Sequence, residues 1–186
     1  TALLQLLPGV YAGNPILGYA TDNALLPKVL FMVILAPVIE EYIFRKQLID
    51  RMHIYGEKLA VITSALMFGL FHGNLSQLFY AFALGLVFGY VYLKTGKLRY
   101  SIGLHMLINF IGSVVGPFFL EKLAVLDTME TMDLATLEPI LPWLLGFGAY
   151  VLVLIGLAIT GLVLLCINKR RVSFAPAELE LPKESR

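Results

Sequence analysis

Four polar side chains in apolar surroundings have the types and spacing that could do chemistry: Glu40, His72, His105 and Asn109. An isolated charge at the centre of a bilayer costs at least about 2.5–3.5 kcal/mol, so ionisable residues in apolar segments usually face a cavity and have a function. A partly desolvated glutamate can act as a general base on a water molecule, and histidine or asparagine can donate to an oxyanion. The set therefore predicts hydrolysis of an amide bond.

The run VIEEYIFR holds two adjacent glutamates with different expected roles. Glu41 and Arg45 are four residues apart on one helix face, in the order that suits an ion pair. We interpret them as an internal ion pair rather than as direct participants in chemistry. Glu40 is rotated by about 100° from Glu41 and has no charged partner one turn away. It needs a partner from another helix.

His72 is the natural candidate for that partner. Gly56 marks the turn of an antiparallel hairpin, with Glu40 16 residues before it and His72 16 residues after it. In straight antiparallel helices the two side chains lie at the same height. His105 and Asn109 are stacked on one face of a third helix, where a plain interhelical hydrogen-bond clamp is the alternative to a catalytic role.

A metal site is a second version of the same chemistry. Glu40, His72 and His105 form the His₂Glu ligand set of catalytic zinc, with a fourth position left for water. Zinc catalysis and a metal-free, glutamate-activated water are equally compatible with the sequence.

The composition indicates which elements position these residues. Of the 186 residues, 59% are hydrophobic and 15% are charged, whereas soluble domains have about 45–50% and about 25%. The only cysteine, Cys166, excludes an intramolecular disulfide and a thiolate metal cluster. We predict an all-α fold: a polytopic membrane helical bundle with an intramembrane active-site cavity. Its five apolar segments are 28–50, 57–73, 76–94, 99–120 and 140–168.

The chain divides around that bundle into three parts. Residues 1–27 are predicted to be an irregular or truncated membrane segment, and 28–168 the catalytic membrane domain. Residues 169–186 are polar and expected to be a disordered cytoplasmic tail. The sequences GLVFG (85–89) and GSVVG (112–116) have the GxxxG spacing that lets helix backbones approach closely.

The distribution of basic residues predicts the orientation. Basic residues gather in alternate connections, and such loops face the cytoplasm. These basic residues are Arg45, Lys46, Arg51, Lys58, Lys94, Lys97, Arg99 and Lys169 to Arg171. The turns 45–58 and 94–99 and the C-terminal tail should therefore be cytoplasmic. With helices ending at one membrane surface, His105 would lie about 10 Å nearer the cytoplasm than His72. The offset disappears if the 45–58 hairpin projects beyond the bilayer. The connection GNLSQ (73–77) would then lie within the membrane, where irregular backbone is tolerated only if it lines a water-filled cavity. We therefore predict such a cavity at these residues.

Three motifs resemble those of a known family. EEYIFR matches an EExxxR motif, FGLFH an FxxxH motif and HMLIN an HxxxN motif, in that order on successive apolar segments. The chain resembles the CPBP intramembrane proteases (CAAX prenyl endopeptidases and bacteriocin-processing enzymes, also called the Abi family) over roughly 28–115. The N-terminal helices expected in the family are largely absent, which favours a truncated chain.

The resemblance implies roles for individual residues. Glu40 would be the catalytic glutamate, and His72 would be its partner in activating water. His105 and Asn109 would stabilise the oxyanion or serve as ligands. Glu41 and Arg45 would order the site, with Phe68 as a packing residue.

The predicted function is an intramembrane endopeptidase. Its partners would be the lipid bilayer and a membrane-associated peptide or protein, prenylated or leader-type, with no nucleic acid. The protein would be integral to a membrane, by resemblance a prokaryotic cell membrane. The main alternative is a non-catalytic protein of the same family that binds a membrane partner, as an immunity or scaffold protein. A proton relay in a small transporter is a third reading.

Overall fold

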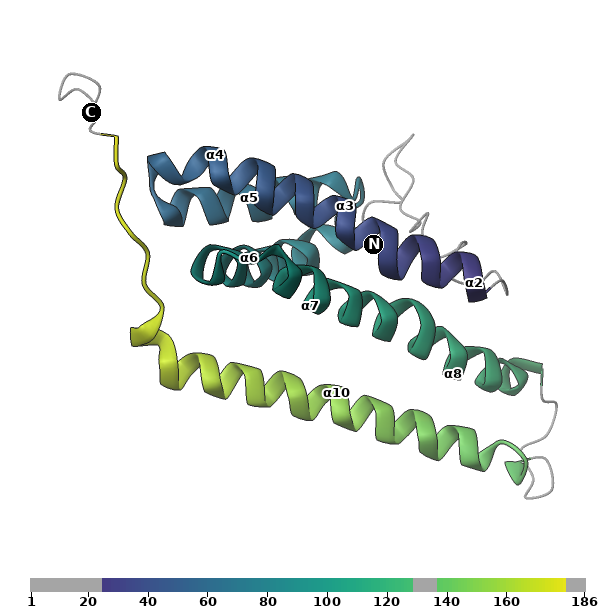
Figure 1. Ribbon diagram of the computed structural model, residues 1–186. Coiled ribbons are helices and arrows are strands. Elements are labelled where there is room, and N and C mark those ends of the chain that lie inside the picture. Colours follow the sequence, from purple (N-terminus) through teal and green to yellow (C-terminus); the bar gives the residue numbers. More distant parts are fainter. Residues whose placement is uncertain (1–24, 129–136, 180–186) are drawn as a thin grey trace, which may run out of the picture. The chain divides into compact units, whose positions relative to one another are not determined.

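The computed structural model describes residues 25–128 and 137–179, and these are helical except for short turns and the C-terminal tail (Figure 1). No strand occurs among them, so the predicted all-α class is confirmed. Residues 1–24, in which the N-terminal segment was predicted, lie outside the described part. The chain forms two compact units, which are described separately: residues up to Ser113 with the tail from Phe174, and Val114–Ser173.

Five helical stretches correspond to the five apolar segments. The first joins α2 (Leu25–Lys28), η2 (Val29–Leu35), α3 (Ala36–Glu41), η3 (Tyr42–Ile49), α4 (Asp50–Met52) and η4 (His53–Tyr55). The second and third are α5 (Glu57–Phe71) and α6 (Leu75–Thr95). The fourth joins α7 (Leu98–Phe110), η5 (Ile111–Val115), α8 (Gly116–Leu123) and η6 (Ala124–Thr128). The fifth is α10 (Leu141–Asn168), followed by η7 (Lys169–Arg171).

Three of the five stretches are long and apolar enough by themselves to cross a membrane. They are Leu75–Thr95, Leu98–Leu126 and Leu141–Arg171. Helix α5 has only 15 residues, and the first stretch contains seven charged residues. Glu40 lies on the first stretch and His72 directly follows α5, whereas His105 and Asn109 lie on the candidate span Leu98–Leu126.

In the first unit, α5 runs back along η3 and α4 as an antiparallel hairpin (Figure 1). The turn is at Gly56, as predicted, and its φ of 108° lies in a region that residues with a side chain rarely adopt. Helix α6 packs along α5, and α7 packs against α3, η2 and α6. The site is therefore built from four helical stretches of one unit.

Close packing of α5 and α6 depends on a glycine of the first GxxxG motif. A Cβ at Gly85 would lie 2.9 Å from Ala65 Cα, and one at Gly89 would lie 3.3 Å from Val61 Cγ1. The packing role predicted for this motif is confirmed. For the second motif the role stays a prediction, because Gly112 has no neighbouring atom within 4 Å among the described residues.

The tail differs from its expected disorder, because part of it packs on the first unit. Phe174 packs against the cluster of Ile49, Ala60, Val61 and Tyr92. The Ala175 amide donates to Glu57 Oε2 (2.8 Å), and the amides of Glu178 and Leu179 donate to the Ile54 carbonyl. An apolar anchor and backbone hydrogen bonds offset the polar composition from which disorder was predicted. Residues 180–186 lie outside the described part.

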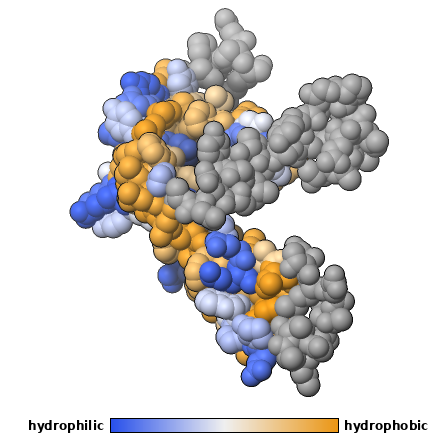
Figure 2. Space-filling model, turned by 90° about the vertical axis from the view of Figure 1, so that its right-hand side faces the viewer, coloured by the Kyte–Doolittle hydropathy of each residue, from blue (hydrophilic) through white to orange (hydrophobic). Residues whose placement is uncertain are grey.

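In the second unit, aromatic side chains join α8 to α10. Phe119 stacks on Tyr150 (5.6 Å between centroids), and Phe118 meets Trp143 edge to face at 5.8 Å. Helix α10 contributes no buried residue, and its leucines, isoleucines and valines are largely exposed. Figure 2 shows broad hydrophobic areas between smaller hydrophilic patches. Such a surface suits a lipid environment.

Candidate active site

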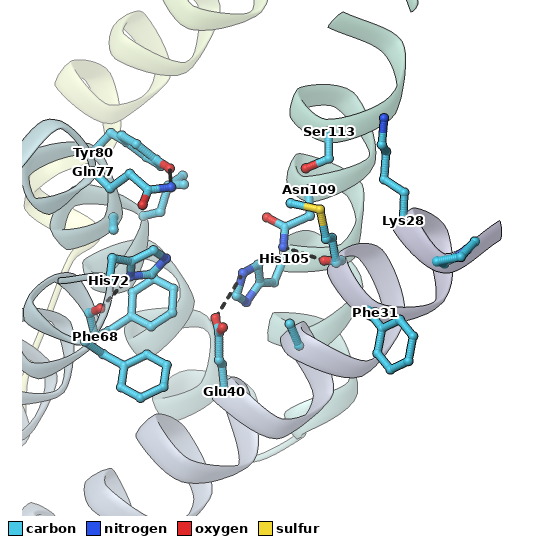
Figure 3. A pocket seen from close by; sticks show the side chains of 16 residues that line it. Lys28, Phe31, Glu40, Phe68, His72, Gln77, Tyr80, His105, Asn109 and Ser113 are labelled. Atoms are coloured by element: carbon cyan, nitrogen blue, oxygen red, sulfur yellow. Dashed lines mark hydrogen bonds and ion pairs between the residues drawn. The ribbon is translucent and has the colours of Figure 1, made fainter. Parts of the chain in front are cut away.

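A cavity of about 550 Å³ lies among the helices of the first unit (Figure 3). Its wall combines apolar side chains with a few polar ones, as in many small-molecule and peptide sites. The polar or charged lining residues are Lys28, Glu40, His72, Gln77, Tyr80, His105, Asn109 and Ser113. The predicted cavity is thus present, and it brings the four candidate catalytic residues to one place.

Behind the wall, Glu41 and Arg45 form the predicted ion pair. Arg45 donates through Nε to Glu41 Oε2 (3.0 Å) and through a terminal nitrogen to Oε1 (3.3 Å). Both side chains are fully buried. Arg45 also donates to Ser64 Oγ (2.7 Å), which donates in turn to the Phe44 carbonyl (2.7 Å). Buried charges require such complete pairing, so this network neutralises the helix interior.

His105 contacts both glutamates, one with each ring nitrogen. Its Nδ1 lies 3.1 Å from Glu41 Oε1, and its Nε2 lies 3.6 Å from Glu40 Oε2. The Glu41 carboxylate, paired with Arg45, can only accept, so Nδ1 carries a hydrogen. Nε2 therefore faces Glu40 and the cavity.

This arrangement corrects one part of the sequence interpretation. His72 was expected to be the interhelical partner of Glu40, but among the described residues the ring nitrogen within 4 Å of the Glu40 carboxylate is His105 Nε2, which forms an ion pair with it when that imidazole is protonated. Register within the α3–α5 hairpin could not reveal this contact, because His105 comes from α7. His72 shares the cavity with Glu40, as the hairpin register predicts.

His72 is held in a similar way to His105. Its Nδ1 lies 2.8 Å from the carbonyl oxygen of Phe68, one helical turn earlier. A carbonyl only accepts, so Nδ1 donates and Nε2 is left as an acceptor on the cavity side. Both site histidines thus have their tautomers set by the acceptor that faces Nδ1, a carboxylate for His105 and a backbone carbonyl for His72.

Phe68 positions both imidazoles. Its ring meets His72 edge to face at 4.9 Å between centroids and His105 at 5.5 Å. The Arg45 guanidinium lies over the same ring at 4.8 Å, and Phe88 stacks on His105 at 5.2 Å. The packing role expected for Phe68 therefore includes direct contact with the histidines.

Asn109 lies one turn beyond His105 on α7. Its Nδ2 donates to the carbonyl oxygen of Met32 (2.8 Å), which joins α7 to η2. This bond is the clamp that was considered for HMLIN, and it uses one of the two amide hydrogens. Within residues 25–128 and 137–179 the second hydrogen has no acceptor in contact, and Asn109 lies on the cavity wall.

The zinc alternative requires Glu40, His72 and His105 to converge on one metal ion. In the ranges 25–128 and 137–179, no group of three or more His, Cys, Asp or Glu side chains is arranged to hold a metal ion. The proposed set of Glu40, His72 and His105 does not fit a metal ion in this arrangement.

Besides Lys28 and Ser113 on the cavity wall, sequence reasoning missed three polar members of the site: Ser64, Gln77 and Tyr80. Ser64 completes the network of Arg45, and the other two line the cavity. Serine and tyrosine are common in apolar helices and gave no signal. Gln77 was recognisable as an amide in an apolar segment and is only 6% exposed.

The fold and the site define a class: a helical membrane protein with glutamate and histidine side chains around a cavity within its helices. Residues 22–111 match the family described as type II CAAX prenyl endopeptidase, Rce1-like. Over 88 residues the chain is 32% identical to the membrane-embedded CAAX protease MroQ of Staphylococcus aureus (strain USA300). Over residues 22–111 the chain therefore resembles the Rce1-like family, in agreement with the resemblance to the CPBP proteases that the motifs indicated.

The similarity covers part of each protein. It extends over 44% of this chain and 36% of MroQ, so the chain spans about a third of that relative's length in the match. No solved structure matches the chain. All the cavity residues lie within or next to the matched segment, since they fall between Pro27 and Ser113.

Proposed function

We propose that the protein is an intramembrane endopeptidase in which Glu40 activates a water molecule. The observation that carries the proposal is the difference in burial and pairing between the two neighbouring glutamates. Glu41 is fully buried in the network with Arg45, whereas Glu40 lies on the cavity wall. The carboxylate that remains accessible is the one placed to act on a substrate.

The proposed reaction proceeds in two steps. Glu40 accepts a proton from water while the water oxygen bonds to the carbonyl carbon of the peptide. His72 Nε2 accepts a hydrogen bond from the other hydrogen of that water. The oxyanion is stabilised by Asn109 and by His105 when its Nε2 is protonated. The carbon–nitrogen bond then breaks, and Glu40 returns its proton to the leaving amine.

The substrate class follows from the surroundings of the cavity. A peptide or protein held at the membrane, prenylated or leader-type, would present its chain to a cavity between membrane helices. We place the 45–58 and 94–99 turns and the tail in the cytoplasm. Their contacts support one common side: Lys94 pairs with Glu57 at 2.6 Å, and the tail binds both Glu57 and Ile54.

The test is cleavage of a fluorogenic peptide library, free and prenylated, by purified protein in detergent micelles. Glu40→Gln should reduce the rate at least about 100-fold, because it removes the general base and preserves the size of the side chain. Glu121→Gln, on exposed α8, is the matched control and should keep the wild-type rate. Full activity of Glu40→Gln would refute the assignment.

The non-catalytic alternative makes the opposite forecast. A protein that only binds a membrane partner would cleave neither free nor prenylated peptides, as wild type or as a variant. Its binding of the partner would be unchanged in Glu40→Gln. Loss of cleavage in Glu40→Gln with an unchanged unfolding temperature would separate the two.

A further inference from the structure

A polar cluster at the start of α6 lies beside the site and has no role in the reaction proposed above. Gln77 and Tyr80 line the cavity, on the same face of α6 (Figure 3). Asn74, the residue before the helix, connects them to the end of α5. The cluster is continuous with the site, because Asn74 Nδ2 donates to the carbonyl oxygen of His72 (3.0 Å).

The orientation of the Gln77 amide is fixed from both ends. Asn74 Oδ1 accepts from the Gln77 backbone amide (2.9 Å) and so caps α6. Asn74 Nδ2 also donates to Gln77 Oε1, so the Gln77 NH₂ group points the other way. That group donates to the Tyr80 hydroxyl oxygen at 2.9 Å.

The Tyr80 hydroxyl is therefore held as an acceptor toward Gln77, and its own hydrogen points elsewhere. A phenol oxygen can accept one hydrogen bond and donate another. Within residues 25–128 and 137–179, no acceptor is in contact with that hydrogen. Tyr80 is half-exposed on the wall of the open cavity, so the donor is available to a bound molecule.

Burial of the Gln77 amide indicates that the hydrogen-bond network around it has a functional role. Burying an amide is unfavourable unless its hydrogen bonds are made, and Gln77 is 6% exposed with both ends of its amide paired. A leucine would fill the same place without that requirement. A satisfied network of this kind gives a donor a fixed position, which is what recognition requires.

We infer that Tyr80 is a substrate-positioning residue whose hydroxyl donates a hydrogen bond to a backbone carbonyl of the bound peptide. The inference rests on the proposed function. A peptide offers a carbonyl acceptor at every residue, and the apolar neighbours of Tyr80 on the wall, among them Phe71, Ala81 and Leu84, would contact its side chains. Because the cluster is bonded to the backbone of His72, the carbonyl is held in register with the reacting bond.

The experiment compares three variants in the same micellar peptide assay. Tyr80→Phe removes only the hydroxyl, and Gln77→Met removes the group that orients it. We expect each to raise KM about 3- to 10-fold with kcat nearly unchanged, as for loss of one ground-state hydrogen bond. Tyr90→Phe is the control, since Tyr90 lies on the same helix but its ring packs against Phe174 of the tail.

A second readout separates this inference from the proposed function. A fluorescein-labelled peptide from the library is titrated into Glu40→Gln protein with and without Tyr80→Phe. A 3- to 10-fold weaker Kd supports the inference even if wild-type protein cleaves nothing, which would refute the protease assignment alone. An unchanged KM and Kd, a loss confined to kcat, or an equal effect of Tyr90→Phe would overturn it, as would no binding at all.

Discussion

His105 Nδ1 and Glu41 Oε1 are hydrogen-bonded at 3.1 Å, and this bond ties α7 to the end of α3. It leaves Nε2 of the same ring 3.6 Å from Glu40. One imidazole therefore contacts two neighbouring carboxylates with different surroundings. The buried one orients the ring, and the one on the cavity wall is left for chemistry.

The buried network predicts a large cost for breaking one partner. Arg45→Met leaves the Glu41 carboxylate without its countercharge at a fully buried position, which should destabilise the protein by about 3–5 kcal/mol. Arg51→Met, on the exposed side of α4, should change stability by less than about 0.5 kcal/mol. Denaturant titration in detergent measures both. Equal stability of the two variants would contradict the network's importance.

The contact between α5 and α6 predicts opposite effects for two glycine substitutions. Gly85→Ala would place a Cβ 2.9 Å from Ala65 Cα, so the helices must separate, at a cost of about 1–3 kcal/mol. Gly103→Ala in α7 meets no described atom within 4 Å and should stabilise its helix by about 0.5–1 kcal/mol. The thermal unfolding temperature should therefore fall for Gly85→Ala and rise for Gly103→Ala, and a fall of similar size in both variants would contradict the close approach at Gly85.

The docked tail predicts a dependence on acid pH through Glu57, in the proposed cytoplasmic turn. The hydrogen bond from Lys94, and next that from the Ala175 amide, lower the pKa of Glu57 below its usual 4.5. A lowered pKa stabilises the docked form above the usual value, and this contribution is lost as pH falls through the lower folded value. We therefore expect hydrogen-exchange protection of the Ala175 amide to decline below about pH 4.5.

The control for the tail is Glu57→Gln. Its Ala175 protection should already be reduced at neutral pH and should not change further in acid, because the titrating group is gone. A wild-type profile in this variant would show that another group controls docking.

The arrangement of the site residues predicts little effect of chelators. Glu40, His72 and His105 are not placed to hold one ion together in the described structure. Cleavage should therefore continue at the wild-type rate after dialysis against EDTA. Inhibition that added Zn²⁺ reverses would contradict a metal-free water and restore the zinc alternative.

Local relationships were predictable from the sequence. The Glu41–Arg45 pair follows from helical spacing, and the turn at Gly56 follows from the register of the hairpin. Glu40 and His72 could be assigned to one cavity for the same reason. These inferences use only neighbours within one helix or one hairpin, where geometry leaves few choices.

Contacts between distant elements were not predictable. His105 and Glu41 are 64 residues apart, and Ser64 has no charge to distinguish it from other small residues in α5. The tail was misjudged because its polar composition outweighed Phe174, whose apolar partners come from three other elements. The candidate site residues could be recognised from their side-chain chemistry, but their contacts with residues of distant elements depend on how the helices pack.

The network around Arg45 also has a consequence for biosynthesis. Its members come from α3, η3, α5 and α7, which are translated at different times. Each ionised residue at the centre of an inserting helix costs about 2.5–3.5 kcal/mol, so the stretch with Glu40, Glu41 and Arg45 should enter the bilayer poorly alone. We expect it to insert together with the helices that supply Ser64 and His105. Completion of the membrane topology and assembly of the site would then be one event.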